Sequence, residues 1–119
     1  MKVLIVDDQK VNRTLPSVLL KQKGCEVLEA ESGEEALALL AEESVDAILL
    51  DVSMPGISGT DLCRQLRAQD AYKGVRIVAY TAHALVSERA DILAAGFDDM
   101  LIKPITRKLL LDALRLPSV

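Results

Sequence analysis

Short apolar segments alternate along the chain with longer stretches in which apolar residues recur every three or four positions. The apolar segments predict β-strands at residues 2–6, 25–30, 47–50, 75–80 and 100–102. The stretches between them predict helices, so the chain consists of five successive β-α units. This alternation is typical of a parallel sheet with helices on both faces. The predicted fold class is therefore α/β, with one doubly wound (βα)5 domain.

The composition of the strands predicts their places in the sheet. Segments 2–6 and 47–50 are almost continuously apolar, which is typical of central strands that helices cover on both faces. Segment 25–30 carries Glu26 and Glu29, and a strand buried on both faces excludes such charges. We therefore expect this segment at an edge of the sheet.

Apolar residues spaced three and four positions apart predict the buried faces of four helices. The sets are Leu15, Val18 and Leu19; Ala36, Leu39 and Leu40; Val86, Ala90, Leu93 and Ala94; and Leu110, Ala113 and Leu114. Pro16 lies inside the first of these stretches, where proline removes a backbone donor and crowds the carbonyl four residues earlier. We therefore expect a kink there, or a helix that starts late.

Several residues mark where helices begin and end. Ser32 and Glu35 have the spacing of a capping box, which predicts a helix start after Ser32. Gly24 and Gly96 lie where the first and fourth helices are expected to stop. A loop rich in glycine and serine predicts that the third helix begins near Gly59.

Length and composition restrict the class of protein. A chain of 119 residues is typical of one domain, which we assign to residues 1–119. No apolar run has the length of a membrane span or a signal peptide, so we expect a cytoplasmic protein without a membrane partner. The formal net charge of -4 disfavours direct nucleic-acid binding. Cys25 and Cys63 lack metal-type spacing and are expected to be free, partly buried thiols.

Three carboxylates follow predicted central strands. Asp7 and Asp8 come directly after the first strand, and Asp51 directly after the third. In an open parallel sheet, ligands bind beyond the carboxyl ends of the strands, where the strand order reverses. Carboxylates gathered at that place repel one another unless a cation offsets their charge. Oxygen ligands of this kind suit Mg²⁺, so the sequence predicts a magnesium site.

The same edge carries a hydroxyl and an amine. Thr81 follows the fourth predicted strand and Lys103 follows the fifth. A carboxylate can attack phosphorus and form an aspartyl phosphate, and phosphoryl transfer otherwise needs alignment and neutralisation of charge. Mg²⁺, Lys103 and Thr81 could supply both. Pro104 comes directly after Lys103, and we expect a cis peptide bond between them that fixes the direction of the lysine.

Four motifs give the chain a family resemblance. "LIVDD", "ILLDVSMPGISG", "YTAHA" and "GFDDMLIKP" occur in this order and together span nearly the whole length. The chain resembles the receiver domains of two-component response regulators. The stretches "TAHAL" and "ERADILAAGFDDMLIKPI" look like those of receivers attached to hybrid histidine kinases or of their single-domain relatives. The resemblance implies a flavodoxin-like fold, CheY-like, with a five-stranded parallel sheet in the order 2-1-3-4-5.

The resemblance also implies a role for each polar residue. Asp51 is expected to be the phosphoacceptor, and Thr81 and Lys103 are expected to contact the phosphoryl oxygens. The Mg²⁺ ligands implied by the family pattern are the carboxylates of Asp7, Asp8 and Asp51 and the backbone carbonyl of Ser53.

The implied function is a phosphorylation-dependent signalling switch. A histidine kinase or phosphotransfer protein is expected to donate the phosphoryl group, and small donors such as acetyl phosphate can replace it in some members. The receiver then changes its affinity for a downstream protein through the face made of the fourth helix, fifth strand and fifth helix. It catalyses only its own phosphorylation and dephosphorylation, so we do not class it as a metabolic enzyme. A homodimer remains open.

Two positions depart from the family pattern or modify it. Met100 occupies the place of the usual switch aromatic, three residues before Lys103. Tyr80 is no obvious substitute, because neighbouring strand residues point to opposite faces. His83, two residues after Thr81, is expected to border the path of the hydrolytic water.

Other interpretations stay open at this stage. A degenerate receiver would keep the fold for protein binding alone. A phosphatase of the haloacid dehalogenase type needs a second aspartate two residues after the nucleophile, where this chain has Ser53. A flavodoxin-like cofactor module needs a glycine- or hydroxyl-rich phosphate cradle after the first strand, and the turn after residue 6 lacks such residues. Asp98 and Asp99 are interpreted as loop charges without a role in the site.

Overall fold

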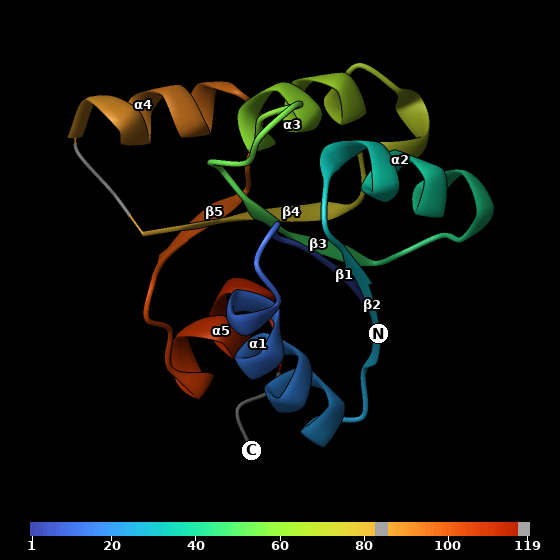
Figure 1. The fold of residues 1–119 in the computed structure, drawn as a ribbon, viewed down its shortest axis with the longest axis vertical. Coiled ribbons are helices and arrows are strands. Elements are labelled where there is room, and N and C mark those ends of the chain that lie inside the picture. The colour runs from blue at the N-terminus through green and yellow to red at the C-terminus, as the bar shows by residue number, and fades with distance from the viewer. Residues whose placement is uncertain (83–85, 117–119) are drawn as a thin grey trace.

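The computed structural model describes residues 1–82 and 86–116, and these form a five-stranded parallel sheet between two layers of helices (Figure 1). The strands are β1 (Lys2–Val6), β2 (Glu26–Ala30), β3 (Ala47–Asp51), β4 (Arg76–Thr81) and β5 (Asp99–Ile102). The helices are α1 (Lys10–Gln22), α2 (Gly33–Glu42), α3 (Gly59–Arg67), α4 (Val86–Ala94) and α5 (Arg107–Ala113), with a 3-10 turn η1 (Asp70–Tyr72). The strand order is β2-β1-β3-β4-β5, which confirms the predicted fold.

The central strands are apolar on both faces because a layer of helices covers each face of the sheet. Helices α1 and α5 lie on one face of the sheet, and α2, α3 and α4 lie on the other (Figure 1). Successive strand residues point to opposite faces; thus Leu4 and Ile48 enter one buried cluster, while Ile5 and Leu49 enter the other. The strands β1 and β3 are central and β2 is an edge, as predicted.

The predicted helix boundaries are confirmed in the structure. The hydroxyl of Ser32 accepts a hydrogen bond from the backbone N–H of Glu35 at 3.0 Å and caps α2. Helix α1 ends just before Gly24, which has φ of +82°, and α4 ends just before Gly96, which has φ of +108°. Glycine takes these left-handed conformations without the steric penalty of a side chain. Helix α3 begins at Gly59.

The predicted buried face of α1 is wrong at two of its three residues, and only Leu19 is partly buried against the core. Leu15 and Val18 are 46% and 47% exposed, and the helix instead buries Arg13, Pro16, Ser17 and Leu20. These residues follow the same helical spacing at a different phase, but two of them are polar, so an apolar pattern cannot find them. The helix starts at Lys10, which excludes the late start expected from Pro16; the kink stays a prediction.

The predicted inner face of α4 is also wrong where the structure describes it. Ala90 and Ala94 are exposed, and Leu93 is 57% exposed. Ile92 and Ala95 are buried instead. The side chain of Val86 lies outside the described residues. The predicted faces of α2 and α5 are confirmed, since Ala36, Leu40, Leu110, Ala113 and Leu114 are buried, while Leu39 is partly buried.

Asp98 is an exposed loop residue, as predicted, but its carboxylate is paired, and Asp99 belongs to β5 rather than to the loop. Oδ2 of Asp98 accepts a hydrogen bond from the backbone N–H of Ile77 at 2.8 Å and lies 2.6 Å from Nη2 of Arg67. Arg67 also donates to the carbonyls of Tyr72, Val75 and Gly96. This network joins the end of α3 to the start of β4 and to the loop before β5.

Cys25 and Cys63 are both free and buried, as predicted. Burial raises the pKa of the Cys63 thiol to about 11, and this keeps it in the unreactive protonated form. Among the described residues, no helix combines the length and the apolar character that a membrane span requires.

Gly59 marks a close approach between α3 and the end of β3. A Cβ atom at this position would overlap the backbone carbonyl of Asp51. We expect Gly59→Ala to lower the free energy of unfolding by about 2 kcal/mol or more, although alanine favours helices. Denaturant unfolding measures the change.

Gly74→Ala is the matched control, because a Cβ there meets no atom within 4 Å. Its free energy of unfolding should stay within about 1 kcal/mol of wild type. Equal stability of the two variants would contradict the close contact at Gly59.

Candidate functional site

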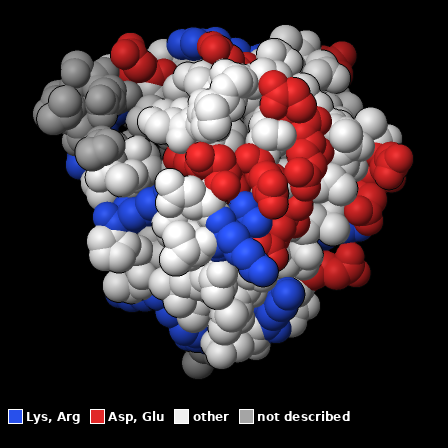
Figure 2. All heavy atoms as spheres, in the orientation of Figure 1, with Lys and Arg blue, Asp and Glu red and all other residues white. Residues whose placement is uncertain are grey.

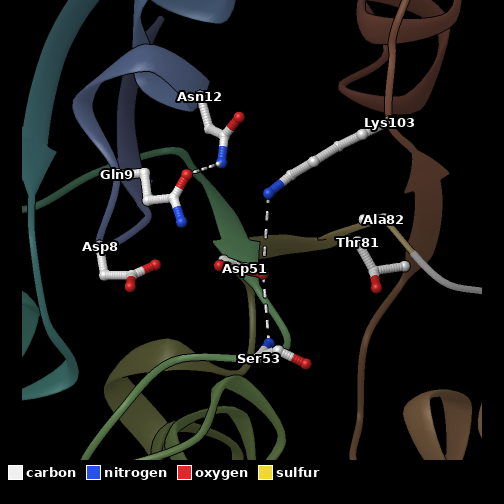
Figure 3. Close-up of a pocket in the computed structure, with 8 residues that line it drawn as sticks. All are labelled: Asp8, Gln9, Asn12, Asp51, Ser53, Thr81, Ala82 and Lys103. Carbon is white, nitrogen blue, oxygen red and sulfur yellow. Dashed lines mark hydrogen bonds and ion pairs between the residues drawn. The ribbon is translucent and has the colours of Figure 1, made fainter.

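Three carboxylates meet at the carboxyl edge of the sheet. Asp7 and Asp8 follow β1, and Asp51 is the last residue of β3. Because β1 and β3 pair directly and in parallel, their ends lie side by side. One carboxylate oxygen from each residue lies within 4.8 Å of the other two. Asp8 and Asp51 line a cleft of about 440 Å³, together with Ser53, Thr81 and Lys103 (Figure 3).

The two adjacent aspartates have different surroundings. Asp7 is fully buried; its Oδ1 accepts a hydrogen bond from the backbone N–H of Gln9 at 2.9 Å, and its Oδ2 lies 2.9 Å from Nζ of Lys103. Asp8 is exposed and lines the cleft. Asp7 is therefore paired within the protein, whereas Asp8 faces the solvent-accessible side of the site.

Asp51 lies at the bottom of the cleft and is 5% exposed. Its Oδ1 accepts a hydrogen bond from the backbone N–H of Ser53 at 3.2 Å and lies 3.9 Å from Nζ of Lys103. Burial, followed by the charge of Asp7, raises the pKa of Asp51 to about 6, and Lys103 only partly opposes this rise. Burial and the neighbouring carboxylate thus outweigh the effect of the single ammonium on the pKa of Asp51.

Lys103 reaches the carboxylates from the far side of the site. It follows β5, and its side chain extends across the cleft with its ammonium toward Asp51 (Figure 3). The bond between Lys103 and Pro104 is cis, as predicted. Thr81, the last residue of β4, is 4% exposed and lines the same cleft. The structure therefore brings together all of the predicted polar groups, and Ser53 lies on the wall opposite Lys103.

The donor set fits a hard divalent cation. Carboxylate oxygens are ligands that Mg²⁺ prefers, and a further positive charge would offset the repulsion among three carboxylates that lie within 4.8 Å of one another. On the face of the molecule seen in Figure 2, acidic side chains form one band near the middle, directly beside basic side chains. The residues present would hold Mg²⁺ through Asp8, Asp51 and Asp7.

Sequence patterns missed three residues that surround the acidic pair. Gln9 and Asn12 line the cleft, and Nδ2 of Asn12 lies 3.4 Å from Oε1 of Gln9. Arg13 is 5% exposed and donates from Nη1 to the backbone carbonyl of Asp7 at 2.7 Å. Its Nε also contacts Glu29 on β2 at 3.0 Å. The only feature of the sequence that could have indicated burial of Arg13 is its helical spacing from Pro16, Ser17 and Leu20.

Met100 and Tyr80 lie on opposite faces of the sheet, which agrees with the expectation that Tyr80 is no substitute for the missing aromatic. Met100 packs against the cluster beneath α2, α3 and α4, whereas Tyr80 belongs to the cluster beneath α1 and α5. Tyr80 therefore does not take the place that the missing aromatic would have on β5. His83 lies outside the described residues.

Comparisons with known proteins agree with this geometry. Residues 3–115 match the family model described as the response regulator receiver domain. The chain is 42% identical over 120 residues to the virulence sensor protein BvgS of Bordetella pertussis, covering 97% of this chain but only 9% of that protein. The chain thus spans about a tenth of the length of the sensor proteins it matches.

Two solved structures share the fold over nearly the whole chain. The chemotaxis protein CheY4 of Vibrio cholerae has a TM-score of 0.89 and 34% identity, with 96% of this chain and 95% of that chain covered. The receiver domain of the sensor histidine kinase PA1611 of Pseudomonas aeruginosa PAO1 has a TM-score of 0.83 and 33% identity, with 96% and 97% covered, and its structure has a magnesium ion coordinated in the active-site cleft.

These similarities fit a phosphorylation-dependent switch, and none of them favours a degenerate receiver. The match covers almost the entire chain, and the acidic cluster lies at the end of the strands that the family pattern implies. The chain belongs to the family of response regulator receiver domains.

Proposed function

We propose that this receiver accepts a phosphoryl group on Asp51 in a Mg²⁺-dependent reaction. The observation that supports the proposal is the convergence of three carboxylates and the Lys103 ammonium on one cleft. Asp51 is the central carboxylate, because it lies at the bottom of the cleft between Ser53 and Lys103 (Figure 3).

The transfer needs a nucleophile and a donor with a good leaving group. A carboxylate oxygen of Asp51 attacks the phosphorus atom, an O–P bond forms, and the bond from phosphorus to the donor breaks. With a phosphohistidine donor, the breaking bond is P–N, and the electron pair and then a proton go to the imidazole. With acetyl phosphate, the breaking bond is P–O and acetate leaves. The receiver thus catalyses its own phosphorylation.

The neighbouring side chains have separate tasks. Lys103 neutralises negative charge beside Asp51 and contacts an oxygen of the incoming group. Thr81 presents its hydroxyl from the end of β4 to the same group. When bound, Mg²⁺ supplies additional positive charge to the carboxylates and to the phosphoryl oxygens. We assign the ion to Asp7, Asp8, Asp51 and the backbone carbonyl of Ser53.

The partners we propose follow from the same chemistry. A histidine kinase or a phosphotransfer protein donates the group, and a downstream protein recognises the changed α4-β5-α5 surface. We propose the cytoplasm as the compartment, since free buried thiols suit a reducing environment. The proposed signalling unit is the domain at residues 1–119, and self-catalysed hydrolysis resets it.

The first test is incubation of the protein with Mg²⁺ and acetyl phosphate, followed by intact-protein mass spectrometry. We expect one phosphoryl adduct per chain. The adduct should be absent in Asp51→Asn, because an amide is a poor nucleophile, and absent after chelation of the metal.

An adduct that persists in Asp51→Asn would place the acceptor elsewhere. If wild type gives no adduct with acetyl phosphate or with a panel of phosphohistidine donors, the proposed function is wrong, and the domain acts by binding alone.

Magnesium should stabilise the folded protein through Asp8. A ligand that binds only the folded state stabilises it by about 2.7 kcal/mol when its concentration is about 100 times Kd. We expect Mg²⁺ to raise the melting temperature of wild type and to have little effect on Asp8→Asn, whose exposed side chain is not needed for folding. Differential scanning calorimetry measures both.

Asp91→Asn is the matched control, because Asp91 is an exposed aspartate on α4. This variant should respond to Mg²⁺ as wild type does, and sodium chloride at equal ionic strength should have no comparable effect. An equal response of the Asp8→Asn protein would exclude Asp8 as a ligand.

Without metal, the carboxyl group of Asp51 should destabilise the fold at neutral pH. Its pKa is near 3.8 unperturbed and about 6 in the folded protein, so the folded state binds the proton more tightly. The resulting stability is fully present below pH 3.8 and is lost as the pH rises through about 6. The difference is on the order of 3 kcal/mol.

The measurement compares unfolding free energies of wild type and Asp51→Asn in the presence of a chelator. We expect the asparagine variant to be more stable at pH 7, and this advantage should shrink as the pH falls from 7 to 4. A difference that does not change with pH would contradict the raised pKa.

A further inference from the structure

The ammonium of Lys103 has a third neighbour besides the two aspartates. Its Nζ lies 4.6 Å from the centre of the Tyr80 ring. Tyr80 is directly opposite Asp51 in the register of β4 and β3. The ring therefore lies beside the site, although Tyr80 points to the opposite face of the sheet from Thr81, which lines the cleft.

A cation over an aromatic face is attracted by the negative charge of the π system, and the attraction grows when both groups are removed from water. Tyr80 is 4% exposed, and the Lys103 side chain is 16% exposed. Both groups thus lie where the attraction is stronger than on an open surface.

The ring of Tyr80 is held by core packing, whereas the side chain of Lys103 is flexible. Tyr80 packs in the buried cluster beneath α1 and α5, together with Val78, Leu101, Ile105 and Leu110. A lysine has a flexible four-carbon stem and a compact charge without directional preference. A contact with a rigid ring therefore restricts the lysine far more than it restricts the ring.

Three contacts together define the position of the ammonium. Nζ lies 2.9 Å from Oδ2 of Asp7, 3.9 Å from Oδ1 of Asp51 and 4.6 Å from the ring centre of Tyr80. Attraction to Asp7 alone would draw the lysine to the fully buried carboxylate, away from the acceptor. The ring adds a third attractive group, from the residue that pairs with Asp51 across β3 and β4.

We propose that Tyr80 is a positioning residue, whose ring face holds the Lys103 ammonium between Asp7 and Asp51. The consequence for phosphoryl transfer rests on the proposed function, but the placement of the lysine does not. The alternative is that Tyr80 only fills the core. Phenylalanine keeps the ring face and leucine removes it while remaining apolar, so the two variants distinguish these roles.

The placement is tested by NMR of protein labelled with ¹³C at the lysine Cε atoms. Protons over an aromatic face are shifted upfield, so we expect the Hε signal of Lys103 to lie upfield of the other lysines. The signal is assigned by its loss in Lys103→Arg. The shift should persist in Tyr80→Phe and disappear in Tyr80→Leu.

The functional consequence is tested by the rate of phosphorylation with acetyl phosphate and saturating Mg²⁺. We expect Tyr80→Leu to be slower by about three- to tenfold and Tyr80→Phe to retain most of the wild-type rate. Tyr72→Leu is the matched control, because Tyr72 packs against the other cluster and its hydroxyl bonds to Leu40. It should react as wild type does.

The outcomes separate the two ideas. A Lys103 signal among the other lysines in wild type, or a wild-type rate in Tyr80→Leu, would overturn the positioning role. A slow Tyr80→Phe variant would also overturn it, because the hydroxyl rather than the ring would then matter. If wild type takes no phosphoryl group, the proposed function fails and the NMR result alone decides whether the ring positions the lysine.

Discussion

Repulsion among three carboxylates at one sheet edge is the constraint on which the rest of the site depends. Asp7 is buried completely, and a buried carboxylate is stable only with a partner. Lys103 is that partner, at 2.9 Å, and it must also serve Asp51 at 3.9 Å. Burial, followed by the charge of Asp7, raises the pKa of Asp51 to about 6, and the single ammonium only partly opposes this rise. The arrangement is therefore suited to bind a further cation.

The scaffold holds this unfavourable cluster in place by contacts at the backbone. Arg13 donates to the carbonyl of Asp7 and reaches Glu29 on β2, so it fixes the turn after β1 to the edge strand. Gly59 allows α3 to approach the carbonyl of Asp51 more closely than any side chain would permit. The site thus sits on elements that cannot separate without breaking buried contacts, and its charges stay close despite their repulsion.

The sequence predicted the fold and the polar groups of the cleft because both depend on local order. A run of apolar residues followed by Asp7 or Asp51 places the carboxylate at the end of its strand, whichever helices pack nearby. The faces of α1 and α4 depended on tertiary contacts and were predicted wrongly. Arg13 is buried because Asp7 and Glu29 accept its hydrogen bonds, and Asp98 is ordered because Arg67 reaches it from α3. Such pairs join residues that no local pattern connects.

Because Lys103 contacts both Asp7 and Asp51, we expect the proposed phosphorylation to affect the packing of α5 through this lysine. Phosphorylation replaces the single negative charge of the Asp51 carboxylate with the roughly two negative charges of a phosphoryl group, a net gain of about one, so we expect the attraction on the ammonium to shift from Asp7 toward the acceptor. Lys103 lies in the segment between β5 and α5, and Ile105 in that segment packs with Tyr80 in one buried cluster. The same cluster contains Leu110 of α5, and close-packed interiors transmit strain, so we expect a pull on the lysine to act on α5. This expected effect on α5 does not involve Met100, which packs on the opposite face of the sheet.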